Sequence, residues 1–271
     1  MEVGELIMRQ TPYNWKVVPL CAEQLMDIDP KDVIPGNVFR LCDVYKSGGG
    51  YDKFPLICEK RTGRKTNPRQ FVVQLYGCHL QCSYCYVTPS GIWNKPLVYT
   101  TDGLAKAFFT TRKLKSDHID VFHLMGGSPA LYIDHWPELI DRLGNEAVFH
   151  SDLLLTEGIY KKEVLEDIAK PNCLYAVNIK GVTSEDYKHN TNCEIDWNTF
   201  WFNMGSLMIF EVPFYITFTN PDMNHYEEFC DTLRKRYGAR ILEDSFVIKL
   251  IEYEATRCYD NERRCETSDR S

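Results

Sequence analysis

Three cysteines in a stretch of eight residues constrain this chain more than any other feature. Cys78, Cys82 and Cys85 have the spacing C-x3-C-x2-C, and a β-prone run at 71–76 leads directly into them. Because they follow a strand on one short loop, the three thiolates can converge on a single metal centre. Structural zinc sites commonly take four protein ligands, and a 4Fe–4S cluster normally takes four cysteines. Three cysteines on such a cluster leave one iron free to bind another molecule.

This motif, with the aromatic Tyr84 directly before the third cysteine, resembles the signature of radical S-adenosylmethionine (SAM) enzymes. The resemblance implies a 4Fe–4S cluster held by Cys78, Cys82 and Cys85, with Tyr84 packed against the cluster or the adenine. It implies that the open iron chelates SAM, and that the reduced cluster cleaves SAM to methionine and a 5′-deoxyadenosyl radical that abstracts a hydrogen atom. An electron donor such as flavodoxin or ferredoxin is implied as well. A zinc knuckle and three unrelated buried thiols are the alternatives.

Composition points to one large domain, or one domain with appendages, in a reducing compartment. The chain has 271 residues, and its formal net charge of −7 gives no general support for nucleic-acid binding. We expect no membrane association, because no run of 18 apolar residues occurs and the N-terminus has no secretory signal. Eleven cysteines, an odd number without an export signal, argue against a disulfide framework. We therefore expect a cytoplasmic protein.

Three regions are predicted along the chain. Residues 1–70 are interpreted as an irregular extension packed on the core, with a few short strands and a flexible glycine turn at 47–50. Residues 71–255 form the main domain. Residues 256–271 form a charged tail, for which solvated structure is favoured over an auxiliary cluster, because its two cysteines, Cys258 and Cys265, are too few to hold one.

Strands and helices alternate through the main domain. Strands are expected at 71–76, 119–125, 147–155, 173–180, 207–219 and 246–251, and helices near 101–113, 134–144, 160–169, 195–204 and 223–236. This alternation predicts βαβ units and a parallel sheet, an α/β fold. The family resemblance implies the specific form, a partial open (β/α)6 barrel. Asp134 is predicted to cap a helix N-terminus, and Gly238 to end the helix before it.

In barrels of this type the chemistry lies at the C-terminal ends of the strands. There the second predicted strand runs into Gly126, Gly127, Ser128 and Pro129, which resemble the family's Gly-Gly-Glu-Pro element. The resemblance implies that this exposed backbone binds the SAM amino group, and two glycines do let a main chain approach a ligand closely. Ser128 stands where the family usually has glutamate, so the role of that carboxylate is open.

The next two strand ends resemble one branch of the family, the activating enzymes of glycyl-radical proteins such as pyruvate formate-lyase. Thr156-Glu157-Gly158 lies where that branch has Asp-Thr-Asn-Gly, and Asn178-x-Lys180 lies where it has Asp-x-Lys. The resemblance implies that Thr156 and Asn178 line the SAM site and that Lys180 contacts the SAM carboxylate or positions the substrate. Asn178 removes the charge of a cation site described in that branch. The alternative for Lys180 is a strand-end lysine in solvent.

Further candidates carry weaker signals. Thr217 is interpreted as a ligand of ribose hydroxyls or substrate, while Asn220 equally suits a helix cap. Tyr253 and Glu254 are the candidate catalytic residues at the last strand end. His123 is interpreted as a hydrogen-bonded core histidine. The basic segment 60–69 indicates either an anionic partner or, as for most charge runs, a solvated loop.

We therefore expect a radical SAM enzyme whose substrate is a protein or peptide residue, with a nucleotide or RNA as the alternative. A non-catalytic zinc-binding interaction module is the alternative from another class. A simple electron carrier is disfavoured, because electron transfer needs no amino-acid-binding backbone at 126–129.

Overall fold

The computed structural model describes residues 14–43, 53–66, 69–85, 87, 89–115, 119–243 and 246–250. Several sequence-based predictions fall outside these residues. They are the glycine turn at 47–50, the candidates Tyr253 and Glu254, and the charged tail with its two cysteines.

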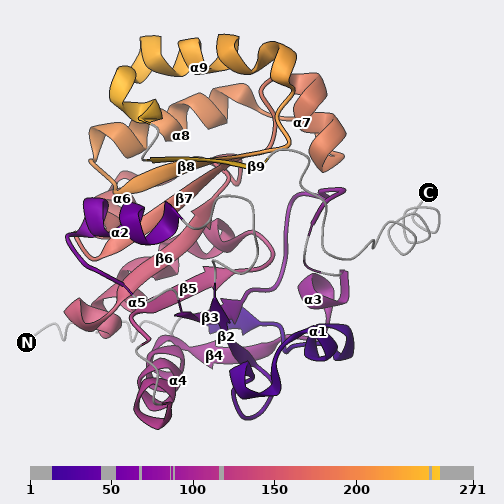
Figure 1. The fold of residues 1–271 in the computed structure, drawn as a ribbon, viewed down its shortest axis with the longest axis vertical. Coiled ribbons are helices and arrows are strands. Elements are labelled where there is room, and N and C mark those ends of the chain that lie inside the picture. The colour runs from indigo at the N-terminus through magenta and orange to yellow at the C-terminus, as the bar shows by residue number, and fades with distance from the viewer. Residues whose placement is uncertain are drawn as a thin grey trace, which may run out of the picture.

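A seven-stranded sheet forms the centre of the fold (Figure 1), in the order β2-β3-β5-β6-β7-β8-β9. Its strands are β2 (Phe39–Asp43), β3 (Arg69–Gln74), β5 (Val121–Met125), β6 (Val148–Leu153), β7 (Cys173–Ile179), β8 (Phe214–Thr219) and β9 (Val247–Leu250). β2 runs antiparallel to β3, and every later neighbour is parallel. Because six parallel strands follow in chain order and the two edge strands do not pair within the described residues, the predicted open α/β barrel is confirmed.

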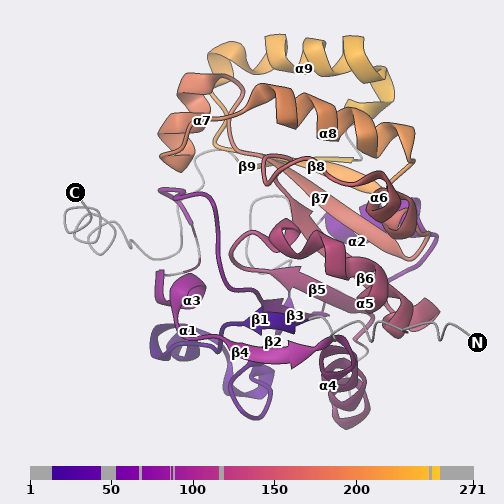
Figure 2. The ribbon, with the colours of Figure 1, turned by 180° about the vertical axis from the view of Figure 1, so that it is seen from behind.

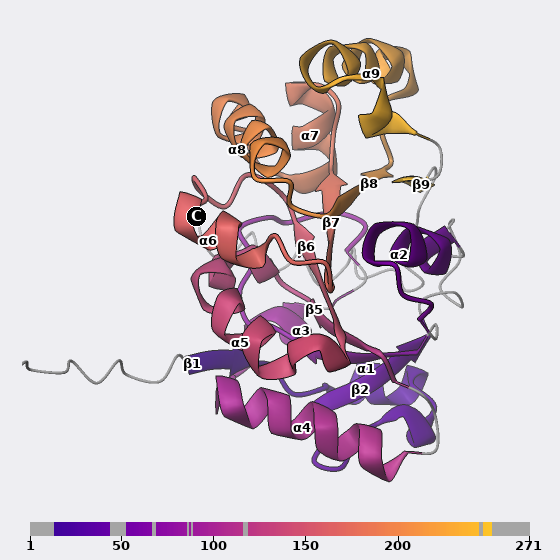
Figure 3. The ribbon, with the colours of Figure 1, turned by 90° about the vertical axis from the view of Figure 1, so that its left-hand side faces the viewer.

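Helices connect the parallel strands and cover one face of the sheet (Figures 2 and 3). They are α4 (Thr101–Leu114), η4 (Pro129–His135), α5 (Trp136–Leu143), η5 (Gly144–Glu146), α6 (Lys162–Ile168), α7 (Ser184–Thr191), α8 (Trp197–Ile209), α9 (Met223–Tyr237) and η6 (Ala239–Leu242). The remaining elements are β1 (Asn14–Val17), α1 (Ala22–Asp27), η1 (Pro30–Asp32), α2 (Phe54–Thr62), α3 (Pro89–Trp93) and β4 (Leu97–Thr100). β1 and β4 form a separate two-stranded antiparallel sheet.

Alternate residues of each strand belong to two different cores, because side chains alternate between the faces of a sheet. Phe122 and Phe149 pack with the helices in the larger core, which we call the helix-side core. Their neighbours Val121 and Val148 point to the other face, where they pack with Phe54 of α2. Figure 3 shows α5, α6 and α8 on one side of the sheet and α2 on the other. We call the α2 side the inner face; α2 covers part of it.

Some predicted boundaries are wrong for identifiable reasons. The strand expected from 207 begins at Phe214, because α8 continues to Ile209 and buries Met204 and Leu207 in the larger core. α7 was not predicted; it begins after Thr183, whose hydroxyl accepts the N–H of Asp186, and ends at Asn192 in a left-handed conformation.

The predicted helix caps are partly wrong. Asp134 lies inside η4 and forms an ion pair with Lys161 at 2.6 Å. Asp222, and not Asn220, caps α9 by accepting the N–H of Asn224. Gly238 ends α9 with a φ of 88°, as predicted.

The packing of α2 on the inner face predicts unequal costs for two truncations on that helix. Phe54 is fully buried, with its ring 4.7 Å from that of His150, whereas Leu56 is 50% exposed. We expect Phe54→Ala to lower the free energy of unfolding by about 3–5 kcal/mol. Leu56→Ala is the matched control, with a loss below about 0.5 kcal/mol. Urea unfolding measures both, and equal losses would contradict this placement of α2.

Candidate functional site

The three motif cysteines lie on the loop that follows β3, at the C-terminal edge of the parallel sheet. All three are half-buried. Burial, together with the neighbouring Cys82 and Cys85, raises the pKa of Cys78 to about 12. As it stands, no group of His, Cys, Asp or Glu in the described part of the chain is arranged to hold a metal ion. The donor set itself fits an iron–sulfur cluster, since a bound cation favours thiolate over thiol.

The cysteine loop is held in place by the end of α7. Gln81 N–H donates to the carbonyl of Thr191 at 3.0 Å, and Ser83 N–H donates to that of Asn190 at 3.2 Å. The side chain of Asn192 donates to the carbonyl of Gln81 at 3.1 Å. These bonds join segments more than 100 residues apart, so no local sequence signal could have identified them.

The turn after β5 lies directly against the cysteine loop. Gly126 and Gly127 have positive φ angles of 73° and 58°, and Ser128 N–H donates to the carbonyl of Gly77 at 2.8 Å. A Cβ atom on Gly127 would lie 2.2 Å from the same carbonyl oxygen, which no side chain tolerates. The conformation and the close approach both require glycine here.

Ser128, at the position of the family's glutamate, is bonded to a carboxylate from the next loop. Its hydroxyl donates to Glu157 Oε1 at 3.0 Å, and Ser128 is fully buried. Glu157 also accepts the N–H groups of Leu154 and Thr156 and the hydroxyl of Tyr160. The carboxylate missing from the turn is therefore present beside it, on the β6 loop. The residue type at 157 was visible in the sequence, but its contact with Ser128 was not.

Thr156 connects the β6 loop to the cysteine loop. Its hydroxyl lies 2.9 Å from His79 Nε2 and 3.3 Å from the hydroxyl of Tyr187. Burial lowers the pKa of His79, which favours the neutral ring. The structure thus brings Thr156 to the cysteine loop, with its hydroxyl engaged by two side chains.

Residues from the ends of β7 and β8 lie near the same loop. The Lys180 ammonium is 5.5 Å from the centroid of the Tyr84 ring, and Tyr84 is buried. Lys180 is therefore half-buried against the cysteine loop and is not a strand-end lysine in solvent. The hydroxyl of Thr217 donates to the side-chain oxygen of Asn178, so these two candidates pair with each other.

Asp152 on β6 is a site candidate that the sequence analysis missed. Asp152 is half-buried. It lies on the inner face, because side chains alternate along β6 and those of Phe149 and Leu153 belong to the helix-side core on the opposite face. Burial raises its pKa to about 6, while Lys180 and a hydrogen bond from Asn178 act in the opposite direction. Its inward position in the β6 alternation was the available signal.

His123 differs from its prediction. It is buried on the inner face of β5, but among the described residues neither ring nitrogen has a hydrogen-bond partner. Its ring lies 4.1 Å from that of His150. Burial, together with the charge of Arg40, lowers its pKa to about 3, so the ring is neutral at physiological pH. The expected hydrogen-bonded core histidine is therefore wrong.

In the basic segment 60–69, Lys60 and Lys65 are exposed, while Arg61, Arg64 and Arg69 are half-buried. Each of its five cations contacts another part of the chain. Lys60 and Arg61 lie on α2 over the Phe246 ring, Arg64 donates to the carbonyl of Asn145, Lys65 pairs with Glu59 and Arg69 pairs with Asp32.

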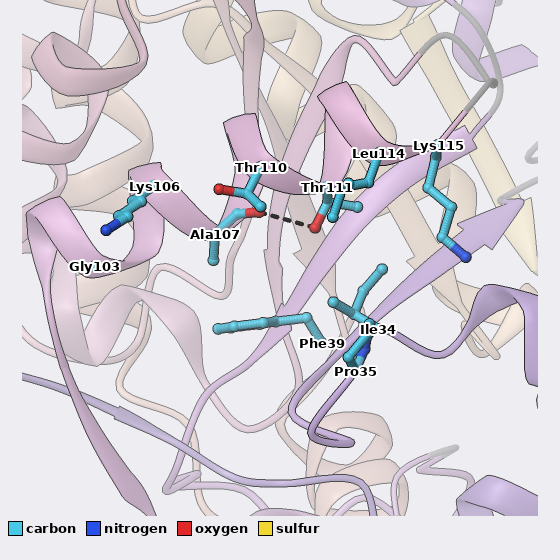
Figure 4. A pocket seen from close by; sticks show the side chains of 10 residues that line it. All are labelled: Ile34, Pro35, Phe39, Gly103, Lys106, Ala107, Thr110, Thr111, Leu114 and Lys115. Atoms are coloured by element: carbon cyan, nitrogen blue, oxygen red, sulfur yellow. Dashed lines mark hydrogen bonds between the residues drawn. The ribbon is translucent and has the colours of Figure 1, made fainter.

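The described surface includes the following two hollows. The larger, about 370 Å³, is an apolar groove between α4 and the η1–β2 segment, with no residue of the cysteine loop (Figure 4). The smaller, about 180 Å³, lies beside the diglycine turn and is lined by Ala130, Leu131, Glu157 and Ile159 among others. None of the described helices is long and apolar enough to span a membrane.

Fold and site together define an α/β protein with a loop of three cysteines at the C-terminal edge of its parallel sheet. Residues 68–196 match the family model described as "4Fe-4S single cluster domain". The matched range includes β3, the three cysteines, the diglycine turn and the β7–α7 segment. The match confirms the predicted 4Fe–4S cluster.

Three solved structures illustrate the proteins that the chain is similar to. Native anSMEcpe with bound AdoMet is 15% identical, with a TM-score of 0.43, over 64% of this chain and 49% of that chain. Spore photoproduct lyase complexed with dinucleoside spore photoproduct is 12% identical (TM-score 0.45; 60% and 51% coverage). Streptococcus suis SuiB bound to precursor peptide SuiA is 14% identical (0.45; 71% and 43%). The chain spans about half the length of these structures. No curated protein matches it.

The close approach of Gly127 to Gly77 predicts a large cost for one added methyl group. We expect Gly127→Ala to lower the free energy of unfolding by about 3 kcal/mol, because a backbone oxygen must move. Gly63→Ala is the control: Gly63 has a φ of 70° with nothing within 4 Å of the added carbon, so only about 1 kcal/mol is expected. Urea unfolding compares the two, and equal losses would mean that the contact is absent.

The raised pKa of Asp152 predicts a pH-dependent gain in stability on its removal. Because the folded chain holds this proton up to a pH of about 6, against an ordinary value of 3.8, ionisation costs folding free energy as pH rises through that window. We expect Asp152→Asn to be more stable than wild type by about 2 kcal/mol at pH 8, and equal to it below a pH of about 4. Urea unfolding across this range tests it, with the exposed Asp167→Asn as a pH-independent control. A less stable Asp152→Asn at pH 8 would refute the assignment.

Proposed function

We propose that this chain is a radical SAM enzyme that removes a hydrogen atom from a protein or peptide residue. The observation that carries the proposal is the contact between Ser128 N–H and the Gly77 carbonyl, which places a diglycine turn against a loop of three cysteines. A zinc-binding module or a simple electron carrier has no use for this second element. The match to a 4Fe–4S single cluster domain supports the iron–sulfur assignment.

In this proposal Cys78, Cys82 and Cys85, which are all half-buried, would hold the cluster. When bound, the cluster and SAM supply the one-electron cleavage that generates a 5′-deoxyadenosyl radical. The buried Tyr84 packs beside this centre and limits the access of water.

The strand-end residues orient SAM. The backbone of Gly126, Gly127, Ser128 and Pro129 receives the amino group, and Glu157 holds this turn in place through Ser128. Lys180, whose ammonium lies over Tyr84, is positioned to meet the SAM carboxylate. Thr156 and the Asn178–Thr217 pair complete the site on the side of β6, β7 and β8.

The layout is nearest to that of the enzymes that activate glycyl-radical proteins, and we propose this branch as the closest functional parallel. Lys180 is kept, while Asn178 supplies an amide where that branch has a carboxylate. The nucleotide or RNA alternative loses its one supporting observation, because the basic segment 60–69 is engaged within the chain. We propose a cytoplasmic location and a flavodoxin or ferredoxin as electron donor. Tyr253 and Glu254 remain predictions.

Anaerobic reconstitution tests the proposal. The wild-type chain should bind roughly four irons and, with dithionite and SAM, release 5′-deoxyadenosine. We expect Cys78→Ala to lose most of the iron and to reduce 5′-deoxyadenosine formation by at least about 100-fold, since an iron loses its thiolate. Cys230→Ala is the control, because Cys230 lies on α9 and is buried in the helix-side core, outside the cysteine loop. Colourless protein with bound zinc would contradict the proposal.

A further inference from the structure

Arg40 on β2 carries a charge that nothing in the described chain balances. It lies on the inner face, because its neighbours Phe39 and Leu41 belong to the helix-side core. Its guanidinium contacts Met125 Sδ at 4.0 Å, and its Nε is buried without a hydrogen-bond partner. Within the described residues no carboxylate forms an ion pair with it, whereas Arg69 pairs with Asp32. A half-buried cation without an anion is costly, so its position requires a compensating role.

His123 lies level with Arg40 across the sheet, and we call the side chains at this level of the inner face the row. Strand register pairs Arg40 with Val72 across β2 and β3, and Val72 with His123 across β3 and β5. His123 is only 7% exposed, yet neither of its ring nitrogens has a partner in the described structure. Buried polar atoms in proteins are nearly always bonded. Two neighbouring side chains with unused donors on one face of the sheet point to a ligand that is not part of the chain.

The row is covered by α2 on one side and less covered on the other. On the covered side α2 packs against the sheet, and Phe54 contacts His150, the strand neighbour of His123. On the other side, toward the strand ends and the cysteine loop, Met125 and Asn178 on the inner face stay half-buried. The inner face is therefore less covered on the side on which the cysteines lie than on the side of α2.

We propose that Arg40 and His123 bind an anionic group of the substrate, a carboxylate or a phosphate, on the inner face of the sheet. The proposal rests on the function proposed above and extends it by naming the chemistry of the substrate. The planar guanidinium offers paired N–H donors that match two oxygens of such a group. The neutral ring of His123 adds a single N–H donor without a second charge.

Asp152 is a carboxylate on the same inner face, and Arg40 is not among the groups that act on its pKa. The groups that act on Asp152 are Lys180, Asn178 and Glu157, all closer to the strand ends. Arg40 instead acts on His123. The inner face thus has an anion-binding row near α2 and a separate carboxylate near the cysteine loop, so a substrate that spans both has an anionic end held away from the reacting end.

The experiment measures binding of sodium phosphate and sodium acetate to the full, cluster-reconstituted chain without SAM or reductant, by calorimetry and by the shift in Tm. We expect both anions to bind wild type and raise its Tm, since a ligand of the folded state stabilises it. Arg40→Met should weaken binding at least about tenfold, the range of a charge-assisted hydrogen bond. Tighter phosphate binding assigns a phosphate-bearing substrate, and tighter acetate binding a carboxylate.

Stability separates a ligand-binding role from a structural one. Arg40→Met replaces an unpaired charge by an apolar chain of similar length, so its Tm without anions should equal or exceed that of wild type. His123→Leu should bind the anions about threefold more weakly at an unchanged Tm, because it removes one neutral donor. Arg240→Met is the control, because the Arg240 side chain is 97% exposed, and it should bind both anions as wild type does.

Two results would overturn the proposal. One is that Arg40→Met binds each anion as tightly as wild type does, or that neither protein binds either anion. The other is a lower Tm of Arg40→Met without anions, which would make Arg40 a structural residue. Neither result involves turnover, so 5′-deoxyadenosine formation by the same preparations shows separately whether the radical SAM assignment holds.

Discussion

The contact between Gly127 and the carbonyl of Gly77 is the constraint on which the rest of the site depends. With 2.2 Å between that oxygen and a hypothetical Cβ, the end of β5 can press on the end of β3 only where a side chain is absent. The N–H of the next residue, Ser128, closes the contact with a 2.8 Å hydrogen bond. The residue after Gly77 is the first cysteine, so the position of the thiolates is tied to the position of the turn.

A network of buried polar groups extends this contact to the neighbouring strands. Ser128 on the β5 turn donates a hydrogen bond to Glu157 on the β6 loop, and Thr156 on that loop is hydrogen-bonded to His79 on the cysteine loop. α7 then holds the far side of the cysteine loop through main-chain bonds. Because most of these groups satisfy one another, the chain itself holds the β5 turn, the β6 loop and the cysteine loop together.

Local patterns accounted for the fold class and for part of the site. Apolar runs of strand length between amphipathic stretches predicted the parallel sheet, and the spacing of Cys78, Cys82 and Cys85 predicted the cluster that the family match confirms. Both signals are local in the chain. The boundary of α8 was misjudged because its apolar residues also suit a buried strand, and tertiary packing decided between the two.

Non-local features were beyond the reach of the sequence. The covering of the inner face by α2, the hold of α7 on the cysteine loop and the pairing of Asn178 with Thr217 all join distant segments. The absence of hydrogen-bond partners at the His123 ring and at Arg40 Nε within the described residues is of the same kind, since a missing contact appears only when the surroundings are known. Unsatisfied buried groups of this kind fit the view that functional sites are where local rules are broken.

Low-temperature electron paramagnetic resonance of the dithionite-reduced, reconstituted chain, recorded with and without SAM, tests the central claim most directly. If three cysteines hold a 4Fe–4S cluster and leave one iron open, the reduced protein gives a cluster signal whose g values shift when SAM is added. A cluster signal that SAM leaves unchanged, or no cluster signal at all, would contradict the account.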